Sequence, residues 1–154
     1  MTNNDIASRK RKLDQQFERA KSLPEGEETT SYVAQYLCIQ VSGYLENSIK
    51  IIYSDFALQK SHPYVANYVS LDLNSFTNAN HNKILKVTGK FSDIWEKKLT
   101  NDLNEEIKDA IDSLIANRNN IAHGQPVGVT YHKVKYWYEK VQEAVMIINS
   151  LTLA

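Results

Sequence analysis

Arg118 and His123 are the two side chains whose types and spacing best suggest chemistry. They lie in the stretch Arg118-Asn119-Asn120-Ile121-Ala122-His123-Gly124. Histidine exchanges protons near neutral pH, and arginine stays cationic and grips phosphate oxygens through two N–H groups. Cleavage of RNA without a metal needs a proton acceptor for the 2′-hydroxyl, a proton donor for the leaving 5′-oxygen, and positive charge for the transition state. These residues could supply all three, with Asn119 positioning the substrate or the imidazole.

The spacing limits what one copy of the stretch can do. Positions five apart on an ideal helix are separated by about 140° around the axis, so Arg118 and His123 should not meet on one face. Asn119 and His123 are four apart, share a face and could form a hydrogen bond. Two copies meeting across a two-fold axis would place two histidines and two arginines around one cleft. We therefore expect a homodimer.

A helix ending is the competing interpretation of the same stretch. Cations in a last turn are favoured by the helix dipole, and Asn, His and Gly are common at helix ends. Gly124 readily takes the left-handed conformation that closes a helix. On composition alone, this structural explanation is the better one.

Two helices are expected to position the stretch. The first is its own helix, capped by Thr100 or Asn101 and carrying an apolar stripe. The stripe consists of Leu103, Ile107, Ile111, Leu114 and Ile115. The second is the longest helical pattern, from about Thr29 to Lys60, which is apolar on nearly every side. A helix of this kind is expected to be central and to contact more than one neighbour, including a second subunit.

Glu46 is the exception within that long apolar helix. It could pair with Lys50 at i+4, or it could reach Arg118 or His123 and orient them. Cys38 lies in the same helix and is best explained as a small core residue.

Shorter segments complete an all-α bundle of about five to six helices. Helices are predicted near residues 5–22, 64–73, 83–90 and 130–151, with a polar loop at Asn74–Asn82 and a short turn through Trp95 and Leu99.

Composition narrows the class of protein. The 154 residues suit a single domain, 1–154, with a core at about 30–150, and 5 Gly with 3 Pro disfavour a turn-rich β fold. Lysine and arginine (18) balance aspartate and glutamate (18), so a general nucleic-acid coating role is disfavoured. One cysteine excludes an internal disulfide, and the four histidines lack paired ligand spacing, so no metal or cofactor is expected. Neither a secretory signal nor an apolar run of about 18 residues occurs, so the cytoplasm is the expected compartment and no membrane is involved.

The heptapeptide resembles the Arg-x4-6-His signature of the HEPN superfamily, and most closely the branch whose name joins HEPN with RiboL-PSP. The resemblance implies an all-α bundle that forms homodimers with a composite site. Many members are metal-independent endoribonucleases of toxin–antitoxin or anti-phage systems, leaving a 2′,3′-cyclic phosphate and a 5′-hydroxyl. By motif match, Arg118 and His123 would be catalytic and Asn119 would assist them.

Further expectations concern auxiliary site residues, binding partners and an alternative function. Glu46, Lys50 and Asn120 are the auxiliary candidates, and RNA and an antitoxin or other defence protein are the expected partners. Some toxins carry a tyrosine two residues after the histidine as the target of antitoxin modification. Gln125 stands there in this chain, so that mode of neutralisation is not expected. The alternative function is a non-catalytic module that binds a partner protein or a nucleotide.

Overall fold

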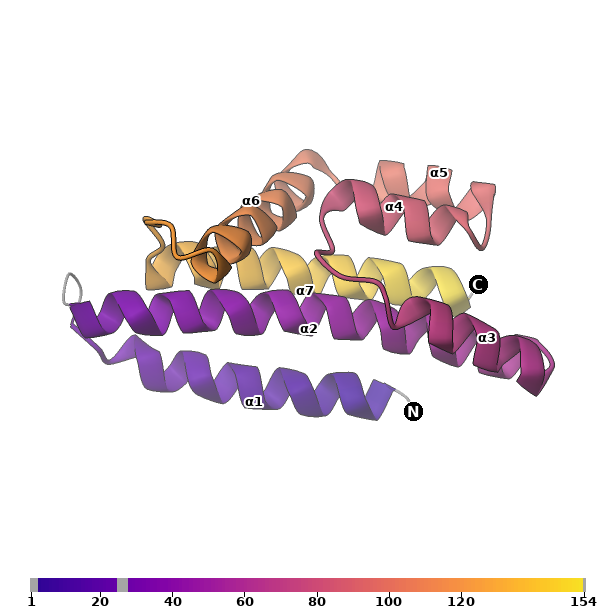
Figure 1. The fold of residues 1–154 in the computed structure, drawn as a ribbon, viewed down its shortest axis with the longest axis horizontal. Coiled ribbons are helices and arrows are strands. Elements are labelled where there is room, and N and C mark those ends of the chain that lie inside the picture. The colour runs from indigo at the N-terminus through magenta and orange to yellow at the C-terminus, as the bar shows by residue number, and fades with distance from the viewer. Residues whose placement is uncertain (1–2, 25–27, 154) are drawn as a thin grey trace.

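A computed structural model describes residues 3–24 and 28–153, and within these ranges it contains seven helices and no strand. They are α1 (Asn3–Lys21), α2 (Glu28–Lys60), α3 (Pro63–Leu73), α4 (His81–Gly89), α5 (Asp93–Asp102), α6 (Glu105–Ala122) and α7 (Tyr131–Leu153). Figure 1 shows α1, α2 and α7 lying side by side, with α6 slanting across α7 and α2 and with α4 and α5 next to each other beyond. The predicted all-α class is confirmed.

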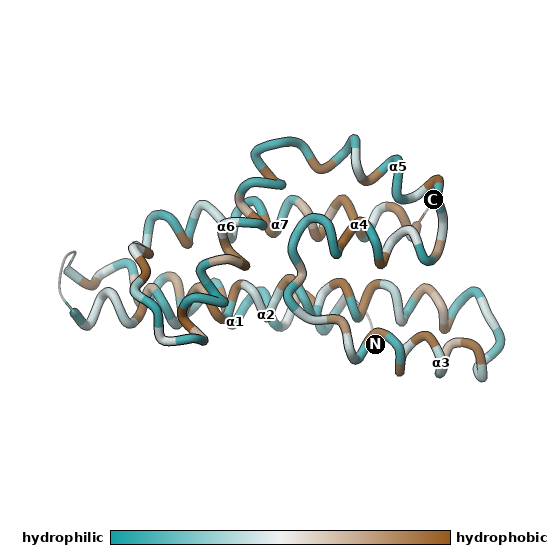
Figure 2. Tube along the Cα trace, turned by 45° about the horizontal axis from the view of Figure 1, so that its top comes forward, coloured by the Kyte–Doolittle hydropathy of each residue, from teal (hydrophilic) through white to brown (hydrophobic). Residues whose placement is uncertain are grey.

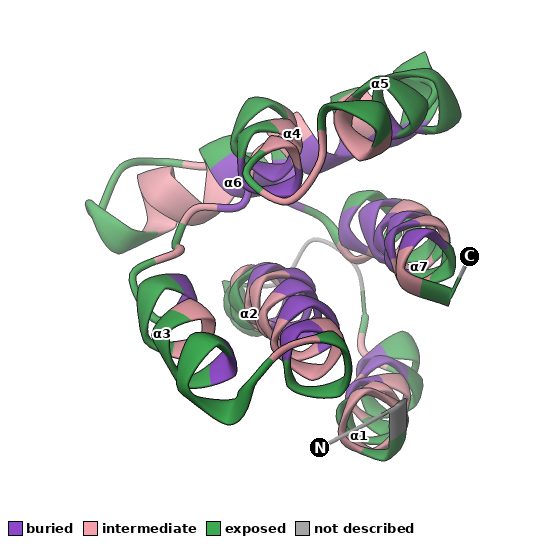
Figure 3. Cartoon of the chain, turned by 90° about the vertical axis from the view of Figure 1, so that its right-hand side faces the viewer, coloured by how far each residue is buried: buried purple, intermediate pink, exposed green. Residues whose placement is uncertain are grey.

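α2 is the central helix of the bundle. It packs against α1, α3, α6 and α7, and Figure 3 shows it surrounded by these neighbours with buried residues on its inner sides. Its fully buried side chains include Leu37, Cys38, Val41, Leu45 and Ile49. A helix with apolar residues on nearly every side must cover several faces at once, which explains its central position.

The count of helices differs from the predicted five to six because α5 is a full helix rather than a short turn. Thr100 and Asn101, the predicted caps of the motif helix, lie inside α5. The chain then becomes extended at Leu103, whose side chain is buried. Asn104 caps α6 instead, and its Oδ1 accepts a hydrogen bond from the Ile107 N–H at 2.9 Å. The extended, buried Leu103 separates α5 from α6, and residues that can cap a helix, Asn101 and Asn104, lie on both sides of it. The sequence pattern does not show which of them is used.

α6 buries one face over most of its length. Its buried residues are Ile107, Ala110, Ile111, Leu114 and Ile115. Four of them belong to the predicted apolar stripe, and the fifth predicted member, Leu103, is buried just before the helix begins. Figure 2 shows hydrophobic and hydrophilic segments alternating along the helices, as expected where each helix buries one side. The last two turns of α6 follow this buried segment and carry the polar motif.

None of the helices in the described part of the chain is both long and apolar enough to cross a bilayer.

Tyr138 of α7 joins three helices through its ring and hydroxyl. The ring stacks on Phe17 of α1 at 4.9 Å and meets Tyr44 of α2 edge-on at 6.0 Å. The hydroxyl donates to Asp14 Oδ1 at 2.6 Å, and Lys10 Nζ lies 2.9 Å from Asp14 Oδ2. Burial alone would raise the pKa of Asp14, but the hydrogen bonds from Tyr138 and Lys10 outweigh burial and hold that pKa below its ordinary value of 3.8.

Replacing Tyr138 with phenylalanine should lower the free energy of unfolding at pH 7 by about 1 kcal/mol, because a partly solvated carboxylate loses one donor. Since the folded-state pKa of Asp14 is lowered, its contribution is present above the ordinary pKa of 3.8 and is lost as the pH falls below it. Urea titrations between pH 3 and pH 7 should therefore show the two proteins converging in stability at the acid end. A constant difference across that range would contradict the assignment.

Candidate functional site at the end of α6

The end of α6 is closed by Gly124. This residue has φ 69°, and the N–H groups of Gly124 and Gln125 donate to the carbonyl oxygens of Ile121 and Asn120 at 3.1 and 2.9 Å. These paired bonds form a Schellman motif, in which glycine avoids the steric cost of the left-handed conformation. His123 is the C-cap residue, with φ −94° and ψ 9°. The prediction that glycine ends this helix is confirmed.

One copy of the chain does not join Arg118 to His123. The backbone stays helical up to Ala122, so the two side chains leave the helix about 140° apart, as expected. The His123 side chain is exposed, whereas Arg118 is half-buried. Among the described residues, no hydrogen bond links the guanidinium to the imidazole.

Arg118 is held by two amide groups. Its Nη1 donates to Asn119 Oδ1 at 3.3 Å and to Asn78 Oδ1 at 3.5 Å. No carboxylate in the described ranges forms an ion pair with Arg118. The guanidinium is therefore oriented by neutral acceptors and its positive charge is not compensated, which suits it to bind a phosphate.

Asn119 contacts the arginine rather than the imidazole. Its side-chain oxygen accepts from Arg118, and its backbone carbonyl accepts the His123 N–H at 3.0 Å. The hydrogen bond between these two residues is therefore the ordinary backbone bond of the helix, and the Asn119 side chain is used by Arg118 instead. Asn120 is half-buried, and its carbonyl takes part in closing the helix.

Cys38 is a core residue, as predicted. It is fully buried, and its Sγ donates to the Leu114 carbonyl of α6 at 3.7 Å. Burial raises the pKa of the Cys38 thiol to about 12, while the charge of Arg118 lowers it by a smaller amount. The thiol therefore stays protonated near neutral pH and is a poor nucleophile.

Glu46 pairs with Lys50, the simpler of its two predicted interactions. Lys50 Nζ lies 3.4 Å from Glu46 Oε1, and both side chains are largely buried. Lys50 Nζ also donates to the backbone carbonyl of Asn74 at 3.5 Å. Among the described residues, Glu46 forms no hydrogen bond with Arg118 or His123. In one copy of the chain, Lys50, paired with Glu46, therefore contacts the start of the α3–α4 loop (residues 74–80).

Asn78 is the site residue that the sequence did not single out. It lies in the predicted polar loop, and its φ of 54° is the only positive value at a non-glycine residue in the described chain. Asparagine tolerates this conformation better than most residues, so an asparagine-rich loop is a weak signal for it. Which of these asparagines would contact Arg118, 40 residues further along, could not be deduced from the pattern.

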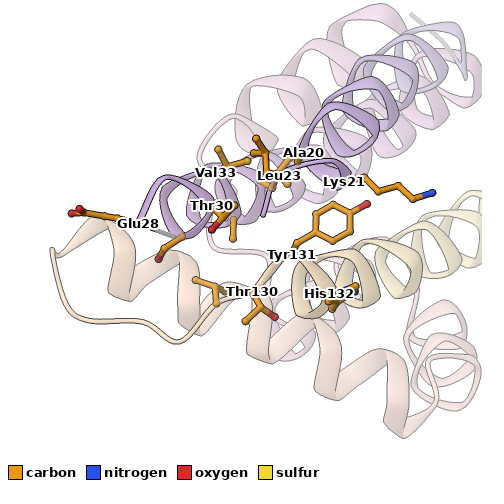
Figure 4. Close-up of a pocket in the computed structure, with 13 residues that line it drawn as sticks. Ala20, Lys21, Leu23, Glu28, Thr30, Val33, Thr130, Tyr131 and His132 are labelled. Carbon is orange, nitrogen blue, oxygen red and sulfur yellow. The ribbon is translucent and has the colours of Figure 1, made fainter. Parts of the chain in front are cut away.

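A cavity lies away from the motif. It measures about 700 Å³ and opens between the end of α1, the start of α2 and the start of α7 (Figure 4). Its walls are mostly apolar and include Val33, Leu37 and Val129, and the exposed side chains of Lys21 and His132 also line it. No residue of the stretch 118–124 contributes to its lining.

Across the described residues, no three His, Cys, Asp or Glu side chains gather closely enough to hold a metal ion.

Comparison with known proteins identifies the family. The family model described as RiboL-PSP-HEPN matches residues 4–153. The match takes in α1 from its second residue, before the expected core at 30–150, and extends to the end of α7. Neither the curated proteins nor the solved structures gave a match. With nearly the whole chain matched, and the helical fold in agreement, this protein belongs to the RiboL-PSP-HEPN family of the HEPN superfamily.

Proposed function

We propose that this protein is a metal-independent endoribonuclease whose active site is completed by a second copy of the chain. The observation that carries this proposal is the state of Arg118. It is half-buried, oriented by two amide oxygens and uncompensated by any carboxylate in the described residues, five positions before an exposed histidine. A cation fixed in this way is suited to the charge that builds up on a phosphate during cleavage.

The proposed reaction uses the RNA's own 2′-hydroxyl as the nucleophile. His123 of one copy removes its proton, and the 2′-oxygen attacks the adjacent phosphorus. The bond to the 5′-oxygen breaks, and the second copy's imidazolium protonates that leaving oxygen. The products are a 2′,3′-cyclic phosphate and a 5′-hydroxyl, so no water is consumed in this step. Arg118 neutralises the phosphorane-like transition state, and Asn119 keeps the guanidinium oriented.

An exposed strip of α2 supports the two-fold arrangement. Tyr32, Tyr36 and Ile39 are 61%, 50% and 40% exposed and lie four and three positions apart, on one side of the helix. Gly43 continues the line, and a Cβ there would meet nothing within 4 Å. Packing within one chain therefore does not explain a glycine that costs about 1 kcal/mol in a helix interior. We call these four residues the α2 strip and assign it to the contact with the second copy.

The test is cleavage of RNA by the purified protein in the presence of EDTA. We expect single-stranded or structured RNA to be cut, with 2′,3′-cyclic phosphate and 5′-hydroxyl ends identified by mass spectrometry and by end labelling. Because the site needs two copies, the specific activity should fall as the protein is diluted below its dimer dissociation constant. Absence of cleavage at all protein concentrations, with folded dimer present, would rule the enzyme out.

A binding module is the second candidate function, and the cavity of about 700 Å³ favours it. A cleft of this size with apolar walls can accept a drug-sized ligand or a side chain of a partner protein. The candidate partners are an antitoxin or another defence protein. This function requires saturable binding of a nucleotide or partner without RNA cleavage. Isothermal titration of nucleotides, run beside the cleavage assay, separates the two functions.

A further inference from the structure

The α3–α4 loop is fixed to the rest of the molecule at several points. Lys50 of α2 donates to the Asn74 carbonyl at the start of the loop. Lys83 Nζ donates to the Thr77 carbonyl at 3.0 Å, and Ala79 is fully buried. At the end of the loop, the His81 N–H donates to Asp112 Oδ1 of α6 at 3.0 Å. The loop therefore has a defined position relative to α6, the helix that carries Arg118.

Asn78 takes a costly backbone conformation in the middle of this loop. Its φ of 54° lies in the left-handed region, which costs about 1–2 kcal/mol for most residues and less for asparagine. The conformation is held by the contacts on either side, including the Asn80 N–H, which donates to the Asn78 carbonyl at 2.7 Å. Strained residues that their surroundings hold in place occur preferentially at functional sites.

The result of this conformation is that the Asn78 amide faces Arg118. Its Oδ1 shares Nη1 of the guanidinium with Asn119 Oδ1. A guanidinium has five N–H donors, and the three on Nε and Nη2 are not used by these two amides. An aspartate could hold Nη1 equally well, but it would cancel the charge that a phosphate requires.

We propose that Asn78 is a positioning residue for Arg118: its amide fixes one edge of the guanidinium, so that the remaining N–H groups meet the scissile phosphate. This inference rests on the proposed ribonuclease function and names a residue outside the Arg–His motif. It also gives Lys50 a role, because Lys50, which pairs with Glu46, donates to the first residue of the loop that presents Asn78.

Two substitutions distinguish the effect of the Asn78 side-chain amide from the effect of its backbone conformation. Asn78→Gly removes the side chain and accepts a positive φ without strain, so the loop keeps its shape. Asn78→Asp keeps size and shape but places a carboxylate on Arg118. We expect kcat to fall about tenfold or more in Asn78→Gly, because small misplacements of a catalytic group are costly. In Asn78→Asp, the KM for RNA should also rise, because the added charge competes with phosphate.

Asn74→Gly is the matched control. It removes an exposed amide from the same loop and leaves in place the backbone carbonyl that Lys50 contacts. Its kcat and KM should equal those of the wild type. If Asn78 only shaped the loop, Asn78→Asp would behave like the wild type, and that result would overturn the positioning role.

A second measurement does not depend on activity. In nitrogen-resolved NMR of the Arg118 side chain, the two Nη groups should give distinct signals in the wild type and in Asn74→Gly, because Nη1 is restrained. In Asn78→Gly, rotation should speed up and the signals should approach one another. If no protein cleaves RNA but this pattern appears, the ribonuclease proposal fails while the positioning of Arg118 stands. Identical Arg118 spectra in all four proteins would refute the positioning itself.

Discussion

Replacing Arg118 or His123 with alanine should reduce RNA cleavage about 100-fold or more in each case. Removing a fixed charge that stabilises a transition state commonly costs about 10²–10³ in kcat, and removing a general acid or base costs about 10²–10⁴. In a symmetric dimer, either substitution removes both copies of the group from one site. The rate of product formation on a defined RNA in EDTA, measured at saturating substrate, gives the effect on kcat.

Both alanine variants should remain folded. His123 is exposed and Arg118 is half-buried, so neither truncation opens a cavity in the buried stripe of α6. Circular dichroism and thermal unfolding should therefore match the wild type. Arg118→Lys is the informative companion variant, because lysine keeps the charge but lacks the two-pronged donor geometry of arginine. We expect it to retain part of the activity. Equal cleavage by wild type and both alanine variants would remove these residues from the mechanism.

Helical periodicity predicted most of the scaffold. The apolar stripe of α6 and the all-round apolar pattern of α2 each follow from residues that recur at helical spacing. The structure buries most of these residues and leaves the α2 strip exposed. The closing of α6 at Gly124 follows from the conformational freedom of one residue. These features depend on local sequence, so local sequence reveals them.

The surroundings of Arg118 were not predictable in the same way. Asn78 is 40 residues away from it, and their contact depends on how the α3–α4 loop crosses α6. The start of α6 at Asn104 likewise depends on the burial of Leu103 against the core. In both cases, several polar residues of suitable type lie close together in the sequence, and packing between distant elements selects one of them.

The α2 strip gives the second large expected effect. Replacing Ile39 with aspartate should weaken the proposed dimer and, with it, RNA cleavage at low protein concentration. A carboxylate buried without a partner costs several kcal/mol. Since a factor of ten in an equilibrium constant corresponds to about 1.4 kcal/mol, the dimer dissociation constant should rise about 100-fold or more. Analytical ultracentrifugation across a dilution series measures that constant, and cleavage assays on the same samples measure its consequence.

A matched variant on another exposed apolar surface controls for the added charge. Leu71 of α3 is 61% exposed and lies beside Tyr68, which is 75% exposed, so this helix also presents apolar side chains to solvent. In Figure 1, α3 lies toward the far end of α2 from the end of α6. A dimer formed through α3 would therefore leave the two motifs apart. Leu71→Asp should leave both dimerisation and cleavage unchanged. The reverse outcome, with Leu71→Asp monomeric and Ile39→Asp still dimeric, would place the interface on α3 and contradict the composite site.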